Sequence, residues 1–343
     1  MLAERLTAQL LAGPPAADAV AVAERLLAVQ AQDPRGARLA VRARTAGLTA
    51  ADVDRALSDD RSLVVDWLNR GTLHLVRRED HAWLHALTTP QLLTGNARRL
   101  AQEGVTPDAA ERGVEVVRRT LADEGPSTRA RLREALDAAG VRTAGQALVH
   151  VLMLASLRGL IVRGPVAGRE QAFALARDWL GEPQPVDRDA ALAELARRYL
   201  AGHGPAGERD LARWAGIRLG DARAGLRAIA GELRERDGGL VDLAARETAA
   251  DAPPPPRLLG PFEPLLLGWC SREPIVGDHQ GLVTVNGIFK PFALAGGRAV
   301  ATWRLARDGD LELEPFAELS DADVAALHED AADVRRFLAP PAR

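Results

Sequence analysis

The sequence is poor in residues on which several common reaction types depend. Its 343 residues include one cysteine, Cys270, and one lysine, Lys290. A single cysteine excludes an intramolecular disulfide and a cysteine-based zinc site, and it favours a cytoplasmic protein. Schiff-base chemistry would have to use Lys290 or the N-terminal amine, because it needs an amine nucleophile.

Long apolar runs and three well-known catalytic motifs are also missing. No stretch of 18 apolar residues occurs, which argues against a transmembrane span. There is no Walker A sequence, no G-x-G-x-x-G after a strand and no G-x-S-x-G. These absences weigh against nucleotide hydrolysis, dinucleotide-dependent oxidoreduction and the acyl transfer of α/β-hydrolases.

The composition is that of a soluble globular protein. Apolar residues make up 47% and charged residues 27%, and the formal net charge is −3. The length indicates two or three domains. Nearly all basic residues are arginine. Two interpretations of this stay open: guanidinium groups that contact phosphates, or a GC-rich coding sequence that favours arginine codons.

The first hundred residues show helical patterns around a predicted β-hairpin. The hairpin covers 62–76, with Asn69-Arg70-Gly71 at its turn. Helices followed by a hairpin are the order of a winged helix. The helical patterns cover 17–31, 34–46, 49–59, 79–88 and 90–103.

This order of elements repeats twice more, over 107–180 and 187–247. "GPSTRARLREALD" and "GPAGERDLARWAG" begin 79 residues apart and place Leu132 and Leu211 at matched positions. In the second unit, Ser127 or Thr128 can cap a helix that Gly140 ends. Residues 160–175 then predict two strands around the Gly164-Pro165 turn, and 238–244 predict a strand in the third unit.

The chain changes character after the proline-rich linker 251–256. Residues 281–316 alternate apolar and polar positions between Asn-Gly and Gly-Gly turns, which predicts an antiparallel β unit. A final helix is expected over 320–338. The fold class is therefore mainly α with β wings: three tandem winged-helix units plus a C-terminal antiparallel β unit. The predicted bounds are 1–105, 106–185, 186–250 and 251–343.

Two glutamines stand where a helix must stop. Asp33-Pro34 places a helix cap and a first-turn proline directly after Gln30 and Gln32. In a continuous helix, residues two apart point in different directions, but in an extended segment they point the same way. Both amides can then share one pocket and orient a water molecule. The alternative is that both are solvated residues at a helix end.

Several basic side chains are candidate DNA contacts, each with a structural alternative. Arg129 and Arg131 start the helix of the second unit, where they could contact phosphates or simply be solvated. Arg70 and His74 lie in the first hairpin, and His74 could face a groove or pair across the hairpin. His81 and His85 have metal-ligand spacing, but no H-E-x-x-H and no third ligand occur. We expect no metal and no cofactor.

The chain resembles a known family in four stretches: "LLAVQAQDPRGA", "NRGTLHLV", "PFEPLLLGW" and "GGRAVATWRL". They are similar to the winged-helix DNA-binding (HTH_42) family, which includes the AlkZ-type DNA glycosylases, over about residues 2–338. The resemblance implies excision of bulky N7-alkylated purines and unhooking of interstrand crosslinks, with Gln30 and Gln32 as catalytic residues. A sister branch has aspartate at the second position. The middle residue here is Ala31, and Glu263 stands where the family usually has aspartate after the linker.

The implied chemistry is consistent with neutral amides. An N7-alkylated purine is cationic and leaves easily, so positioning of water and electrostatic support suffice. The near absence of lysine favours a monofunctional, water-using reaction over a lyase. A C-terminal hairpin of the family is matched most closely by 271–281, which makes Arg272 and His279 candidate DNA contacts.

The resemblance also implies the partner and the location. We expect a cytoplasmic, nucleoid-associated monomer that binds double-stranded DNA with alkylated or crosslinked purines, does not bind a membrane and gives self-resistance. Two alternatives remain open. One is a non-catalytic winged-helix regulator, and the other is a resistance protein that sequesters a toxic small molecule.

Overall fold

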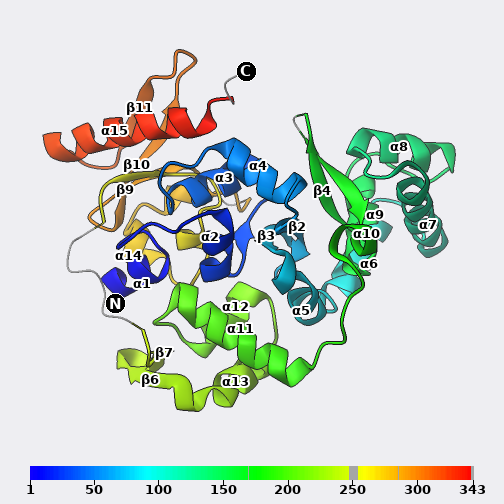
Figure 1. Cartoon of the computed structure of the whole chain (residues 1–343), viewed down its shortest axis with the longest axis horizontal. Coiled ribbons are helices and arrows are strands. Elements are labelled where there is room, and N and C mark those ends of the chain that lie inside the picture. The colour runs from blue at the N-terminus through cyan, green and yellow to red at the C-terminus, as the bar shows by residue number, and fades with distance from the viewer. Residues whose placement is uncertain (169, 247–253, 285, 341–343) are drawn as a thin grey trace. The chain divides into compact units, whose positions relative to one another are not determined.

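The computed structural model describes residues 1–168, 170–246, 254–284 and 286–340 (Figure 1). The chain is rich in helices and contains antiparallel sheets, and it forms two compact units. Unit 1 comprises Met1–Val53, Leu192–Trp214 and Arg218–Arg343, and unit 2 comprises Asp54–Ala191 and Ala215–Ile217. Within the described ranges, no helix is long and apolar enough to span a membrane. The division into four parts at 105, 185 and 250 stays a prediction.

Unit 2 contains the first two predicted hairpins. Strands β3, β2, β4 and β5 lie side by side in that order, and neighbours run antiparallel. The turn between β2 and β3 is the predicted Asn69-Arg70-Gly71, and both Asn69 and Gly71 have positive φ. The first hairpin is therefore confirmed. The strands are β2 (Leu63–Leu68), β3 (Thr72–Arg77), β4 (Ile161–Ala167) and β5 (Glu170–Leu175).

The second hairpin turns at a different place from the predicted one. Gly164 and Pro165 lie inside β4 rather than at the turn, and the register shifts between Arg163 and Val166. Proline cannot donate a ladder hydrogen bond, so within a sheet it is tolerated at such an irregularity. The chain reverses after β4 instead, where Gly168 has a φ of 65°.

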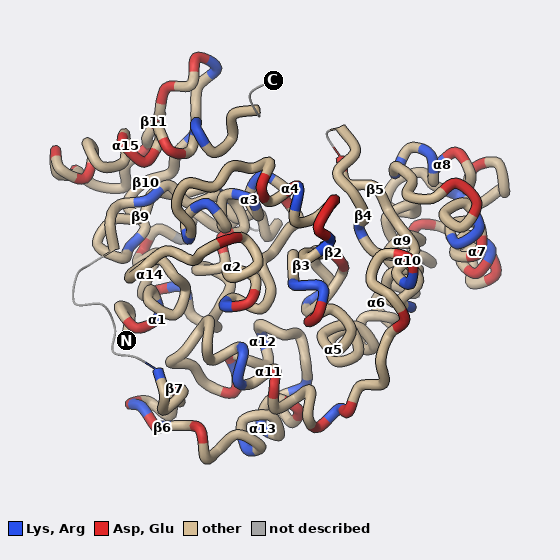
Figure 2. Tube along the Cα trace, in the orientation of Figure 1, with Lys and Arg blue, Asp and Glu red and all other residues tan. Residues whose placement is uncertain are grey.

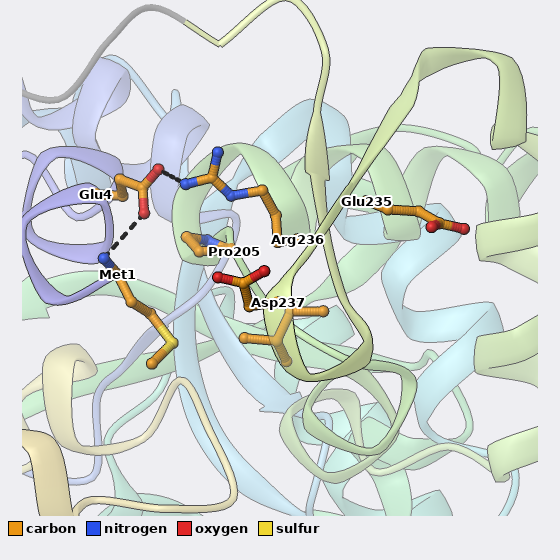
Figure 3. Close-up of a pocket in the computed structure, with 7 residues that line it drawn as sticks. Met1, Glu4, Pro205, Glu235, Arg236 and Asp237 are labelled. Atoms are coloured by element: carbon orange, nitrogen blue, oxygen red, sulfur yellow. Dashed lines mark hydrogen bonds and ion pairs between the residues drawn. The ribbon is translucent and has the colours of Figure 1, made fainter.

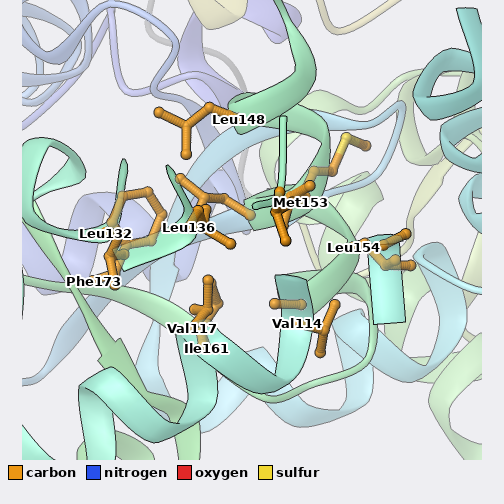
Figure 4. Packing of buried hydrophobic residues seen from close by; sticks show 14 of the residues in the cluster. Val114, Val117, Leu132, Leu136, Leu148, Met153, Leu154, Ile161 and Phe173 are labelled. Carbon is orange, nitrogen blue, oxygen red and sulfur yellow. The ribbon is translucent and has the colours of Figure 1, made fainter. Parts of the chain in front are cut away.

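Helices α6 to α9 of unit 2 pack around one apolar cluster, in which Leu132 of α8 lies beside Phe173 of β5 (Figure 4). Thr128 caps α8 by accepting a hydrogen bond from the Arg131 amide at 3.2 Å, as predicted. The helices are α4 (Ala50–Ser58, which begins in unit 1), α5 (Arg78–Thr88), α6 (Leu92–Gln102), α7 (Pro107–Glu124), α8 (Arg129–Ala138), α9 (Ala147–Leu157) and α10 (Ala176–Leu180).

A buried polar network ties three elements of unit 2 together. The carboxylate of Asp66 on β2 accepts a hydrogen bond from Ser156 of α9 at 2.5 Å. Its other oxygen contacts Nε2 of His81 on α5 at 2.8 Å. The carboxylate is fully buried, and such a group is tolerated only when its hydrogen bonds are made.

Unit 1 holds the third hairpin and the C-terminal sheet. β6 (Leu233–Arg236) and β7 (Leu240–Leu243) form a hairpin, in which β7 is the strand predicted over 238–244. The predicted C-terminal antiparallel β unit is also confirmed, with the order β11-β10-β9-β8. Its strands are β8 (Arg257–Leu259), β9 (Phe292–Ala295), β10 (Arg298–Leu305) and β11 (Leu311–Pro315).

The helices of unit 1 include the predicted final helix, which Ser320 caps by accepting from the Asp323 amide at 3.1 Å. Of the linker 251–256, residues 251–253 lie outside the described residues, and 254–256 have no regular structure. The helices are α1 (Leu2–Ala8), α2 (Ala19–Leu26), α3 (Pro34–Arg42), α13 (Leu219–Ala228), α14 (Glu273–Val276) and α15 (Asp321–Leu338), with most of α11 (Arg188–His203) and α12 (Glu208–Ala215). Short 3₁₀ turns cover Ala230–Glu232, Asp237–Gly239, Pro264–Leu266 and Gln280–Leu282.

Candidate active site

The two glutamines lie on a short non-helical segment between α2 and α3. The helix predicted over 17–31 ends earlier, at Leu26, because Leu27 leaves the helical region with a φ of 63°. Val29 and Gln30 then form the short strand β1. The break in the helix brings the two side chains together, and Nε2 of Gln30 donates a hydrogen bond to Oε1 of Gln32 at 2.6 Å. That the two amides share a catalytic pocket stays a prediction.

The glutamine pair reaches from the interior of unit 1 to its surface. Gln30 is 6% exposed, whereas Gln32 is exposed. Ala31 between them is 5% exposed. Because the two amides are hydrogen-bonded to each other, the small side chain of Ala31 does not separate them.

Helix α3 begins directly after the glutamines, as the sequence predicts. Asp33 has an extended backbone and accepts a hydrogen bond from the Gly36 amide at 2.7 Å, and Pro34 is the first helical residue. The start of α3 also lies very close to the backbone of Pro261. A Cβ atom on Gly36 would come within 2.4 Å of the Pro261 carbonyl oxygen, so glycine is required there.

Two arginines hold the far end of α3. Nη2 of Arg44 lies 2.5 Å from Oε1 of Glu263, and both side chains are 0% exposed. Arg44 also donates to the Gln9 carbonyl oxygen at 2.8 Å. Arg42, the last residue of α3, pairs with Asp330 and with Asp333 of α15. Glu263, in place of the family's usual aspartate, is thus an anchor for the helix that follows the glutamines.

Among the predicted DNA contacts, His74 requires a correction. It is 2% exposed, lies opposite Asp66 in the β2–β3 ladder, and its Nδ1 contacts the Thr72 carbonyl oxygen at 2.9 Å. Burial, reinforced by the nearby Arg70 charge, lowers the pKa of His74 to about 3. The imidazole is therefore neutral and internal, and it supplies no surface cation.

The other three candidates of unit 2 differ in how their charges are compensated. Arg131 forms a forked pair with Glu124, at 2.8 and 2.5 Å, and lies 3.7 Å from Glu134. Its charge is already neutralised within the protein, which argues against the predicted phosphate contact. Arg70 and Arg129 are half-buried. Arg129 forms no ion pair with any carboxylate in the part of the chain that the structure describes.

The segment 271–281, matched above to a hairpin, is instead helical. It contains α14 and the start of a 3₁₀ turn, and Pro274 stands in the first turn of α14, where a missing amide proton costs nothing. Arg272 donates to the Leu266 carbonyl oxygen at 2.8 Å and stacks on Phe289. His279 is exposed and stacks on Phe316, with ring centroids 4.3 Å apart. Both therefore stay candidates for DNA contacts, on a helical segment.

The H-x-x-x-H pair is engaged in hydrogen bonds within unit 2. His81 contacts Asp66, and Nε2 of His85 lies 2.9 Å from the Ser156 carbonyl oxygen. Over the described residues, no three His, Cys, Asp or Glu side chains gather as metal ligands would.

A pocket of about 390 Å³ in unit 1 contains neither glutamine (Figure 3). Within it, Glu4 pairs with the N-terminal amine at 3.0 Å and with Arg236. We assign it no part in the site. It is lined by Met1, Glu4, Pro205, Glu235, Arg236, Asp237 and Leu240.

Comparison with known proteins shows which family the chain belongs to. A family model described as "DNA glycosylase AlkZ-like" matches residues 23–337. The chain therefore belongs to the AlkZ-like family and is a DNA glycosylase. It is 30% identical to the interstrand DNA cross-link repair glycosylase of Streptomyces sahachiroi, over 94% of this chain and 91% of that protein. The solved structure of Streptomyces sahachiroi DNA glycosylase AlkZ matches it with a TM-score of 0.80 at 28% identity, covering 98% of this chain and 95% of that one.

The Arg44–Glu263 pair predicts a strong, non-additive effect on stability. Glu263→Gln or Arg44→Met alone should lower the free energy of unfolding by about 3–5 kcal/mol, because each leaves one buried charge unpaired. The double variant should lose less than the sum of the two single losses. Urea unfolding measures all three. The exposed pair Arg118–Glu115 provides the control, since Glu115→Gln should change stability little. Additive losses would contradict the pairing.

His74 predicts a loss of stability in mild acid. Its folded pKa of about 3 lies below the unfolded value of 6.5, so the unfolded chain binds the proton more readily. The contribution is complete above pH 6.5 and falls as the pH drops, by about 2 kcal/mol at pH 5. Urea unfolding at pH 7.5 and 5 should therefore show a smaller pH effect for His74→Asn than for the wild type. His279→Asn, at an exposed position, is the control, and an unchanged pH effect in His74→Asn would refute the assignment.

Proposed function

We propose that this DNA glycosylase excises bulky N7-alkylated purines and unhooks interstrand crosslinks, with Gln30 and Gln32 orienting the hydrolytic water. The observation that carries the proposal is the 2.6 Å hydrogen bond between the two amides, at the surface end of a helix pinned at both ends. The crosslink part rests on similarity to a Streptomyces sahachiroi protein named for that repair.

The two amides position the water molecule and do not act as bases. Oε1 of Gln32 accepts one hydrogen bond from Gln30 and has a second lone pair, with which it can hold a water proton. The water oxygen then attacks C1′ as the C1′–N9 bond breaks. The bonding electrons move to the purine and cancel its N7 charge, and the water proton passes to solvent. Such positioning accelerates a bond that is already weak.

This chemistry predicts selectivity for cationic bases. A neutral amide cannot remove a proton as a carboxylate does. The pair therefore accelerates the release of a neutral purine or uracil too little. A crosslinked base resists extrusion from the duplex, and attack on the labile bond does not require it. The single lysine, Lys290, favours a monofunctional enzyme.

The architecture proposed for DNA binding is three tandem winged-helix units. Its support is the three hairpins β2–β3, β4–β5 and β6–β7, each preceded by helices. We further propose that the protein acts as a monomer associated with the nucleoid, and that it provides self-resistance to an alkylating product.

Single-turnover release of base from a duplex with one N7-methylguanine tests the proposal. Gln32→Leu removes the amide at similar size and should slow release roughly 100-fold, the scale of losing one positioned polar group. Gln102→Leu, an exposed glutamine on α6, is the matched control and should not slow it. A uracil duplex should release no base.

One outcome would contradict the proposed mechanism. Equal rates of base release for the wild type and Gln32→Leu would exclude the catalytic role of the pair.

A further inference from the structure

Two arginines of unit 2 form no ion pair with a carboxylate among the described residues. Arg129 is the first residue of α8, and Arg163 lies in β4. In the part of the chain that the structure describes, Nε of each is buried without a hydrogen-bond acceptor. Their surroundings are otherwise well compensated: Figure 2 shows acidic and basic positions mixed along α7 and α8, and Arg131 of the same helix pairs with Glu124.

The backbone brings these two arginines to one place. Ser127, two residues before Arg129, exchanges backbone hydrogen bonds of 2.9 and 2.8 Å with Phe173 of β5. Phe173 in turn stands opposite Arg163 in the β4–β5 ladder. The start of α8 and the middle of β4 are therefore neighbours on either side of Phe173.

Aromatic rings fix the orientation of the Arg163 guanidinium. Its carbon lies 4.1 Å from the centre of the Phe173 ring and 5.2 Å from that of Trp67. Among the described residues, its Nη1 makes only a long hydrogen bond of 3.4 Å, to the Gln171 carbonyl oxygen. A planar guanidinium held against rings in this way keeps its donors set in a fixed direction.

The arrangement is electrostatically unfavourable without an anion. Burial, and then the Arg129 charge, lower the pKa of Arg163 to about 10. Asp66 and Glu170 oppose this shift, but the Asp66 oxygens are occupied by Ser156, His81 and the Trp67 amide. Arg129 also stands at a helix N-terminus, where the dipole disfavours positive charge. A bound anion would offset the cost of burying Arg163, its repulsion by Arg129 and the unfavourable helix dipole at Arg129.

We propose that Arg129 and Arg163 together bind one backbone phosphodiester of the DNA duplex. The proposal rests on the proposed function and adds a positioning residue, Arg163, for which the sequence patterns give no signal. Two guanidinium forks can share the two non-bridging oxygens of a phosphate. The site joins the start of α8 to the strand of the second hairpin, so one phosphate would set the register of this unit on DNA without reading a base.

Binding to an undamaged duplex as a function of salt tests this site. Each phosphate contact contributes about 0.9 to the slope of log K against log salt. Because the two arginines share one phosphate, Arg163→Gln and Arg129→Gln should each lower the slope by up to that amount, and the double variant should lower it by no more. Each single variant should weaken binding several-fold. Arg163→Lys keeps the charge and should retain the slope. Arg131→Gln is the matched control on α8 and should bind with the wild-type slope, because Arg131 is already paired.

Further measurements keep the test decisive. The melting temperature of each variant identifies loss of folding, and a merely structural role of Arg163 would lower it without changing the salt slope of the folded protein. Inorganic phosphate, compared with chloride at equal ionic strength, tests a free anion as the occupant. The proposal would be overturned if inorganic phosphate stabilised the wild type but not Arg163→Gln, while the salt slope of DNA binding was the same for both proteins.

The outcome can also be separated from the proposed function. An unchanged slope in Arg163→Gln and Arg129→Gln, with base release still lost in Gln32→Leu, would reject the phosphate site and leave the glycosylase mechanism in place. A lower salt slope in both variants, with no base release by the wild type, would support the phosphate site and reject the glycosylase mechanism.

Discussion

The buried ion pair between Arg44 and Glu263 is the constraint on which the glutamine site depends. It joins residues 219 positions apart in the chain and lies entirely out of water. Breaking such a pair costs far more than a surface pair, because one charge then stays buried alone. With the Asp33 cap at the other end, it fixes both ends of α3. The backbone that carries Gln30 and Gln32 enters α3 directly and is fixed with it.

Local features of the sequence predicted the parts of the fold that depend on neighbouring residues. Asp33-Pro34, Thr128 and Ser320 each cap the helix expected, because a cap needs contacts only three residues away. Boundaries set by longer contacts were wrong. The helix expected to reach residue 31 ends at Leu26, where Leu27 turns the chain into β1. Likewise, β4 continues through Gly164-Pro165, because a bulge accommodates the proline within the ladder.

As with the fold, the sequence predicted only those parts of the candidate site that depend on neighbouring residues. The two glutamines share one face because of the local break, which the sequence shows. The charge state of more distant side chains depends on what the fold places around them. His74 is buried and neutral, and Arg131 is neutralised by Glu124 from the preceding helix. Arg163 stands in an ordinary strand sequence, and only the neighbouring Phe173 and Arg129 distinguish it.

The central claim is that two neutral amides, rather than an ionisable base, support hydrolysis of an already cationic nucleotide. The pH dependence of single-turnover base release from N7-methylguanine DNA, measured between pH 6 and 9, tests this most directly. Glutamine does not titrate, so the account predicts a rate that stays nearly constant over this range. A rate that rises about tenfold per pH unit up to a plateau would reveal a general base and would contradict it.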